Sequence, residues 1–306
     1  MNIPLSLALN NYDHVRDIMS GDIRPQGIDL LPLELPIEEI FYRFTRFREW
    51  QASEMSFGKV VSLLSEPKPE IVAIPVFVSR VFRHSALYVP EGSPIRKPKD
   101  LEGKRVGIPE WAQTAGIFVR GMLVDEYGVD LAKVEWHQAG VREPGRVEKV
   151  ELNLPKGVRI ARHPDKTLVG MLAAGELDCV MSAREVPAPR LFRDFRAAEA
   201  EYWKKTRIFP IMHVVVLKRD VYEAHRWIAM NLYKAFDEAK NRSLARVREF
   251  GLSHLPLPWV PDHTRQWVEL SGDDFWPYGV EPNRPSLEAF FLYSHEQGVA
   301  KKHLRM

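Results

Sequence analysis

Short apolar segments typical of strands alternate along this sequence with segments that have helical spacing. The first long helical segment, residues 37–50, places Ile37, Ile40 and Phe44 on one face. Other segments of the same series are strand patterns at residues 5–9, 27–35, 54–57 and 70–78, and a short helix at residues 14–19. Such alternation is typical of a parallel or mixed sheet with helices on its faces, so the sequence predicts an α/β fold.

A second series of alternating segments begins near Pro98. Its expected elements are a short helix and a strand in residues 100–109, a helix over 113–127, a helix and a strand over 167–181, a strand over 213–217, and helices over 227–250 and 287–295. At 306 residues the chain is long enough for two lobes. We expect residues 1–90 and 214–306 to form a discontinuous first lobe, and residues 91–213 to form the second.

The charge balance and the cysteine count exclude several classes of protein. The chain has 43 Lys and Arg residues and 41 Asp and Glu residues, which gives no basis for nucleic-acid binding. Its one cysteine, Cys179, allows neither an internal disulfide nor a CxxC metal site. Because Cys179 lies in an apolar strand pattern, we expect it to be a small core residue rather than a nucleophile.

The start of the sequence has no targeting pattern. Residues 1–10 contain neither a basic segment nor a long apolar run, so no signal peptide is expected. No segment approaches the length of a membrane span. We therefore expect a cytoplasmic protein with no membrane partner.

The segment Phe77–Ser85, FVSRVFRHS, is the strongest candidate for ligand binding. It follows an apolar strand pattern and brings Arg80, Arg83 and His84 within five residues of one another. A planar guanidinium can bind a carboxylate through two parallel hydrogen bonds, so this segment predicts a site for an anionic ligand. The alternative is a solvated loop whose charges bind nothing.

Several longer segments resemble one enzyme family. VFRHSALYVP, LEGKRVGIPEWAQTAGIFVRGMLVDEYGV, TLVGMLAAGELDCVMSAR, RIFPIMHVVVLKRDVYEAHRWIAMNLYKAFDEAK and FWPYGVEPNRPSLEAFFLYSHEQGV are similar to the 4,5-dihydroxyphthalate decarboxylase family. The similarity runs in order from about Leu5 to Val299. RxFRHS and FPIMH are its distinctive motifs, whereas LxGKRVG is common in solute-binding proteins.

This resemblance implies both a fold and an activity. The fold would be of the type II periplasmic-binding-protein class, with two lobes and a ligand cleft between them. The activity would be conversion of 4,5-dihydroxyphthalate to protocatechuate and carbon dioxide, with no redox cofactor and no metal. The expected partner is a small aromatic carboxylate. Two alternatives are a lyase for another aromatic acid and a non-catalytic solute-binding protein for an aromatic or small carboxylate.

Decarboxylation of such a substrate requires cations for the carboxylates and an acid for the ring carbon. Arg80 and Arg83 are the first candidates for carboxylate binding, although either could form a structural ion pair. His84 and His213 are the candidate catalytic residues, because an imidazole titrates near neutral pH. A buried structural role is the alternative for both histidines.

Further candidate substrate-binding residues follow the expected strands or begin the expected helices. Ligands of open α/β sheets bind at the carboxyl ends of strands, and helix N-termini favour anions. The candidates are Asn10 and Tyr12 with the neighbouring Asp13 and His14 after the first strand, Glu54 and Ser56 at the third, Gln113 and Thr114 at a helix start, and Arg184 after a strand. Glu54 could activate a substrate hydroxyl or remain a solvated charge.

Motifs for other chemistries are missing from the sequence. The ten histidines show neither HxH nor HExxH spacing, no GxSxG motif occurs, and no glycine-rich phosphate loop is found. We therefore expect no metal and no nucleotide. Apolar residues near the C-terminus are a hint that the chain assembles as a homo-oligomer.

Overall fold

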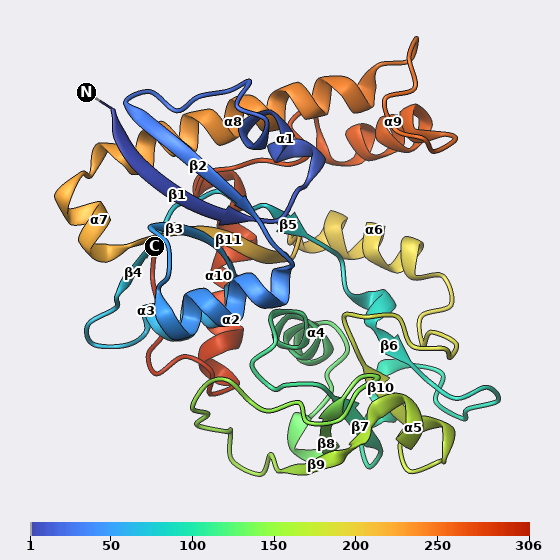
Figure 1. Cartoon of the computed structure of the whole chain (residues 1–306). Coiled ribbons are helices and arrows are strands. Elements are labelled where there is room, and N and C mark those ends of the chain that lie inside the picture. The colour runs from blue at the N-terminus through green and yellow to red at the C-terminus, as the bar shows by residue number, and fades with distance from the viewer. Residues whose placement is uncertain (1) are drawn as a thin grey trace. The chain divides into compact units, whose positions relative to one another are not determined.

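A computed structural model describes residues 2–306 (Figure 1). The chain divides into two compact units, and each is made of three separate segments of the sequence. Unit 1 consists of residues 2–56, 68–80 and 213–284, and unit 2 consists of residues 57–67, 81–212 and 285–306. Each unit contains its own sheet.

Unit 1 is built on a mixed sheet with the strand order β2-β1-β3-β11-β4, and β5 also pairs with β11. The strands are β1 (Ile3–Leu9), β2 (Ile28–Glu34), β3 (Ala52–Ser56), β4 (Ile71–Ala73), β5 (Ser79–Arg80) and β11 (Ile211–Lys218). β1 runs parallel to β2 and β3, whereas β11 runs antiparallel to β3 and β4. Most residues of β1, β3 and β11 are buried, which places these strands in the core.

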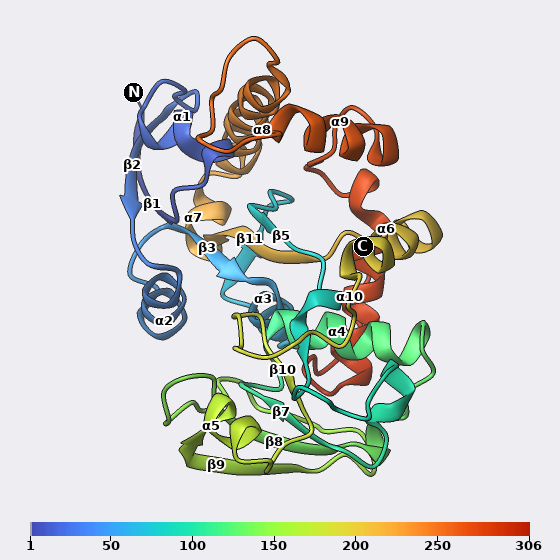
Figure 2. The same cartoon turned by 90° about the vertical axis from the view of Figure 1, so that its right-hand side faces the viewer.

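Helices lie on both sides of strands β1 and β2 of unit 1 (Figures 1 and 2). The helices of this unit are η1 (Asp13–Val15), α1 (Arg16–Met19), α2 (Ile37–Phe47), α7 (Arg219–Ala224), α8 (Trp227–Arg248), α9 (Val260–Ser271) and η5 (Glu281–Asn283). The amphipathic α2 buries Ile40 and Phe44 and ends at Arg48, which has a left-handed conformation. α8 buries one face that includes Leu232 and Phe236.

Unit 2 is built on a second sheet with the strand order β6-β10-β7-β8-β9. Its strands are β6 (Leu87–Tyr88), β7 (Arg105–Ile108), β8 (Glu135–Gly140), β9 (Ile160–Thr167) and β10 (Cys179–Met181). All pairings are parallel except that of β6 with β10. Its helices are α3 (Phe57–Leu64), η2 (His84–Ala86), η3 (Pro98–Leu101), α4 (Thr114–Asp125), η4 (Leu131–Lys133), α5 (Leu168–Ala173), α6 (Phe195–Thr206) and α10 (Arg284–Glu296).

The structure confirms the α/β class and most of the expected elements. The strand expected over residues 70–78 is shorter, because β4 ends at Ala73 and Pro75 has no N–H to donate to the sheet. The sequence reading missed β8, β9, α3, α6 and α9.

The contacts divide the chain differently from the expected lobe boundaries. Residues 57–67, 81–90 and 285–306 belong to unit 2, although the sequence placed them in the first lobe. Aromatic packing explains two of these differences, because the Phe290 ring stacks on Phe57 at 4.5 Å and on Phe118 at 4.6 Å between centroids. Within the described part of the chain, no helix is both long enough and apolar enough to cross a membrane.

Candidate functional site

Three polar side chains of unit 1 meet where strands β1 and β3 end and β11 begins. They are Tyr12, Glu54 and His213. β1 and β3 are parallel, so Tyr12, which follows β1, lies near the carboxyl end of β3. β11 is antiparallel to β3, and the pairing of His213 with Ser56 brings the start of β11 to the same edge. Glu54 and Ser56 share a face because alternate residues of a strand point the same way. His213 is therefore a diagonal neighbour of Glu54.

The Glu54 carboxylate is the centre of this Tyr12–Glu54–His213 triad. The Tyr12 hydroxyl donates to Oε1 at 2.5 Å, and Nδ1 of His213 lies 2.7 Å from the same oxygen. The backbone N–H of Asn10 donates to Oε2 at 3.0 Å. Glu54 is fully buried, and these donors satisfy both of its oxygens, as an ionised carboxylate requires.

The triad fixes the orientation of the His213 ring. An ionised carboxylate only accepts hydrogen bonds, so Nδ1 of His213 carries a proton and donates it to Glu54. Nε2 is then available to accept a proton when the ring is neutral, or to donate one when the ring is charged. The His213 side chain is 17% exposed, whereas that of Glu54 is 0% exposed. This arrangement of a buried carboxylate behind an accessible imidazole suits general acid–base chemistry.

Burial keeps the Tyr12 hydroxyl protonated. Desolvation, followed by the negative charge of Glu54, raises the pKa of Tyr12 far above its ordinary value. Tyr12 therefore acts as a hydrogen-bond donor to Glu54 and not as a base at neutral pH.

Aromatic residues support the triad from other elements of unit 1. The His14 ring stacks on Tyr12 at 5.3 Å between centroids and contacts the Trp276 ring at 5.2 Å. Its Nε2 lies 3.0 Å from the carbonyl oxygen of Val78. Burial lowers the pKa of His14 to about 4, so this ring is neutral and serves as packing. Phe41 of α2 meets the His213 ring edge-on at 4.9 Å.

Asp13 and Arg80 have structural partners within unit 1. The Asp13 carboxylate accepts hydrogen bonds from Ser243 at 2.6 Å and Arg246 at 3.3 Å. Arg80 is buried and donates to the Pro277 carbonyl at 2.7 Å and to the Asn283 side chain. These contacts favour the structural alternative for Arg80, and its role as a carboxylate ligand stays a prediction.

Arg83 and His84 belong to unit 2, where they differ in their surroundings. Arg83 is half-buried, and its Nε donates to the weakly accepting sulfur of Met212 at 3.3 Å. Burial lowers the pKa of Arg83 to about 10. A desolvated guanidinium with so weak an acceptor is suited to binding a carboxylate.

His84 is enclosed by aromatic rings rather than by polar groups. Its ring lies edge-on to Phe192 at 5.1 Å and to Tyr202 at 5.2 Å, and the residue is 1% exposed. Neither ring nitrogen has a hydrogen-bond partner among the described residues. Burial lowers the pKa of His84 to about 4, which disfavours proton donation by this imidazole at neutral pH.

The remaining candidates of unit 2 lie near the ends of β7 and β10. Thr114 is buried, and its hydroxyl oxygen accepts a hydrogen bond from the Gly58 N–H at 2.8 Å. Gln113 precedes α4 and is partly exposed, and Arg184 lies on an exposed loop after β10. Just before α4, Glu148 accepts hydrogen bonds from the N–H groups of Trp111 at 2.7 Å and Ala112 at 3.2 Å, and anion binding by the first amides of α4 itself stays a prediction.

Potential metal ligands and the single cysteine are the remaining features of the described residues. No group of three or more His, Cys, Asp or Glu side chains among residues 2–306 is arranged to hold a metal ion. Cys179 is buried, and burial raises the pKa of its thiol to about 12, which confirms the expectation of an inert core residue.

Sequence reasoning did not identify Phe41 as a supporting residue, or the direct pairing of Glu54 with His213. Phe41 has no polar pattern that would single it out. The pairing joins residues 159 positions apart, and only the sheet register reveals it.

Comparisons with known proteins find similarity over nearly the whole chain. A family model described as NMT1/THI5 like matches residues 71–145. A 4,5-dihydroxyphthalate decarboxylase of Comamonas testosteroni is 34% identical over 312 residues, which cover 99% of this chain and 94% of the relative. A protein of the same name from Pseudomonas putida is 34% identical over 209 residues, covering 65% of this chain and 81% of that relative.

Solved structures resemble this chain in fold. The periplasmic sulfonate-binding protein SsuA of Methylobacillus flagellatus superposes with a TM-score of 0.56 at 14% identity, and the match covers 99% of this chain and 90% of that protein. The likeness confirms the expected periplasmic-binding-protein-like α/β class and concerns the fold alone.

Proposed function

Because this chain belongs to the 4,5-dihydroxyphthalate decarboxylase family, we propose that it converts 4,5-dihydroxyphthalate to protocatechuate and carbon dioxide with His213 as the proton donor. The chain is thus a carboxy-lyase of that family, and its partner is a small aromatic carboxylate. The proposal includes action in the cytoplasm, which immunodetection after cell fractionation would test.

The chemistry of the substrate determines what the protein must supply. Each carboxyl group of 4,5-dihydroxyphthalate has a hydroxyl para to it, and this hydroxyl can donate electrons to the carbon that bears the carboxyl. A proton added to that carbon gives a cationic ring intermediate. The carbon–carboxylate bond then breaks, its electron pair restores the aromatic ring, and carbon dioxide leaves. One proton is consumed for each carboxyl group lost.

His213 is suited to deliver that proton from Nε2. In its charged form the ring has two N–H groups, of which Nδ1–H is engaged by Glu54. Glu54 offsets the positive charge and holds the ring in one orientation, so Nε2–H is the proton available to the substrate. After transfer the neutral ring keeps its Nδ1–H bond to Glu54 and takes up a new proton from water.

Tyr12 and the Asn10 backbone N–H support the acid indirectly. Both donate to the Glu54 carboxylate and hold it in place beside the His213 ring. Without such donors a buried carboxylate would take up a proton itself.

The observation that carries the proposal is the 2.7 Å contact between Glu54 Oε1 and Nδ1 of His213. Incubation of the purified protein with 4,5-dihydroxyphthalate, with carbon dioxide and protocatechuate measured together, tests the function. In deuterated water the product should carry one deuterium at the carbon that lost its carboxyl group. Recovery of unchanged 4,5-dihydroxyphthalate would instead support the non-catalytic solute-binding alternative.

A further inference from the structure

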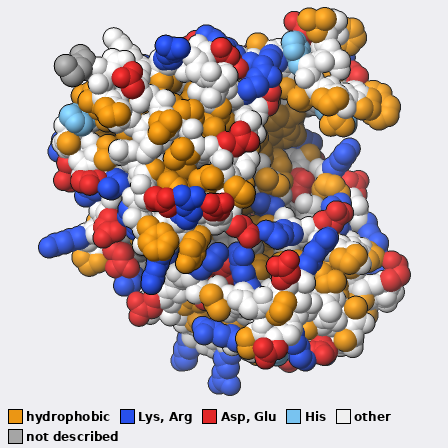
Figure 3. Space-filling model, viewed as in Figure 1, with side chains coloured by type: hydrophobic (Ala, Val, Ile, Leu, Met, Phe, Trp, Pro, Cys, Tyr) orange, Lys and Arg blue, Asp and Glu red, His pale blue; other side chains and the backbone are white. Residues whose placement is uncertain are grey.

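The segment after α8 exposes an unusual number of large apolar side chains. This segment, residues 249–271, consists of an irregular loop and α9 and is called the arm below. The loop exposes Phe250 at 77%, Leu252 at 66%, Leu257 at 62% and Trp259 at 70%. Hydrophobic side chains also gather over this region at the upper right of Figure 3. Exposed patches of this kind mark interaction sites.

The helix of the arm has no buried residue. All twelve residues of α9 lie in the described part of the chain, and each is either exposed or only partly buried. Helices in globular proteins gain most of their stability by burying an apolar face. α9 has apolar residues for such a face, including Val260, Trp267 and Val268, but it covers them incompletely against its own chain.

Trp259 is held in a backbone conformation that bulky residues rarely adopt. Its φ of 61° and ψ of 14° lie in the left-handed region, directly before α9. Such a conformation persists where the surroundings favour it, and here it accompanies an indole ring that is largely exposed. The strain is easier to explain if the ring has a binding partner.

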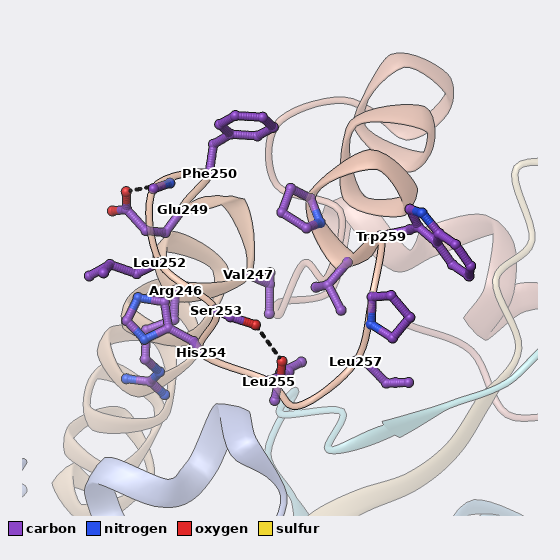
Figure 4. A pocket seen from close by; sticks show the side chains of 14 residues that line it. Arg246, Val247, Glu249, Phe250, Leu252, Ser253, His254, Leu255, Leu257 and Trp259 are labelled. Atoms are coloured by element: carbon purple, nitrogen blue, oxygen red, sulfur yellow. Dashed lines mark hydrogen bonds between the residues drawn. The ribbon is translucent and has the colours of Figure 1, made fainter.

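A hollow next to these side chains could receive an aromatic ring. Its volume is about 350 Å³, and its lining runs from Arg246 at the end of α8 to Pro261 at the start of α9. Phe250 and Trp259 lie on opposite sides of it, with Val247 between them (Figure 4). The arm therefore combines projecting aromatic rings with a hollow, as self-complementary surfaces do.

We propose that the arm binds the arm of a second copy of this chain in a symmetric dimer. Aromatic side chains such as Phe250 and Trp259 bury about 150–250 Å² each, and together with the smaller exposed areas of Leu252 and Leu257 they form a patch of roughly 500 Å². Two such patches together bury about 1,000 Å², which reaches the lower bound of a specific interface. A copy of the same arm fits the chemistry, because an apolar patch with a hollow matches an identical patch.

The charge of the arm is also compatible with the association of two identical arms. The arm carries the acidic residues Glu249, Asp262 and Glu269 and the basic Arg265, so no strong field of one sign opposes a symmetric contact. A nucleic acid or an acidic membrane surface would require a basic patch, which these residues do not provide.

Sedimentation velocity of the full chain at micromolar concentrations tests the dimer. The wild-type chain should sediment as a dimer, and the double variant Phe250→Ser, Trp259→Ser should sediment as a monomer with an unchanged circular dichroism spectrum. The matched control is Leu31→Ser, since Leu31 of β2 is 60% exposed and lies outside the arm. A monomeric wild-type chain, or a double variant that stays dimeric, would overturn the proposal.

Distance measurement provides a second readout that does not depend on folding of the double variant. The native cysteine, Cys179, is buried, so a spin label attached to Leu257→Cys reports on the arm. A short distance between labels on two copies is expected, and absence of dipolar coupling contradicts the dimer. Neither readout uses decarboxylation, so each is interpretable even if the proposed activity fails.

Discussion

Oε1 of Glu54 lies 2.7 Å from Nδ1 of His213, although the two residues are 159 positions apart in the chain. The antiparallel pairing of β3 with β11 creates this contact, and the buried carboxylate then determines which nitrogen of His213 is free for chemistry. The mechanism proposed above rests on this relationship.

Glu54→Gln should separate the role of the charge from that of the hydrogen bond. Glutamine has the same shape and can still accept a hydrogen bond from Nδ1–H, but it does not offset the charge of the imidazolium. We expect kcat to fall by about 10²–10⁴-fold. Steady-state kinetics with 4,5-dihydroxyphthalate check this, with Glu34→Gln on strand β2 of the same sheet as a matched control. A kcat within twofold of the wild type would remove Glu54 from the mechanism.

Arg83→Gln should weaken substrate binding. A hydrogen bond between charged groups contributes about 1.5–3 kcal/mol, so KM should rise roughly ten- to hundredfold with a smaller change in kcat. Arg159→Gln is the comparison, because Arg159 is an exposed arginine of the same unit and is not a candidate for substrate binding. If Arg83→Gln leaves KM unchanged, the carboxylate is bound elsewhere.

Thr114→Val tests whether this residue binds substrate or supports the fold. Its hydroxyl accepts from the Gly58 N–H, and valine would leave that buried donor unpaired. We expect the free energy of unfolding to fall by about 1–3 kcal/mol with KM unchanged. Thr114→Ser keeps the hydroxyl and should restore stability. Denaturant unfolding and steady-state kinetics, measured on the same variants, distinguish the two roles. A raised KM at unchanged stability would show that Thr114 binds substrate.

His84 should make the protein sensitive to acid. Its pKa is lowered by burial to about 4 in the folded state, below the ordinary value of 6.5, so the unfolded chain binds this proton more readily. Its contribution to stability is complete above pH 6.5 and is lost as the pH falls toward 4, by about 3 kcal/mol at most.

His84→Phe should therefore resist acid better than the wild type. Phenylalanine fits the aromatic surroundings and has no nitrogen to leave unpaired, so stability at pH 7 should be equal or greater. Unfolding monitored as a function of pH checks the shift. His14, whose pKa is also lowered to about 4 by burial, keeps its own share of the acid sensitivity in both proteins. Loss of turnover in His84→Phe at full stability would support the catalytic role that the sequence suggested.

The sequence predicted those elements whose apolar pattern is regular. β1, α2 and α8 each bury a continuous face or stripe, and their residue types show it. β9 was missed because its sequence, IARHPDKT, is polar, contains a proline and forms an edge of the sheet. α9 was missed because polar residues separate its few apolar ones, which include Val260, Trp267 and Val268.

The candidate site was predictable one residue at a time but not as an arrangement. Tyr12, Glu54 and His213 were each identified from their position at the end or start of a strand. Their contacts depend on the order and register of strands that the sequence does not specify. Thr114 and Arg80 have hydrogen-bond partners within their own units, which their sequence positions did not reveal, and substrate binding by either residue stays a prediction.

The most direct test of the account is the turnover of His213→Gln with 4,5-dihydroxyphthalate, measured as carbon dioxide release. The proposed role predicts that kcat falls by about 10²–10⁴-fold while KM changes by only a few-fold. His225→Gln, at an exposed histidine of the same unit, should behave as the wild type. If His213→Gln keeps near-normal turnover, His213 is not the proton donor and the proposed mechanism is wrong.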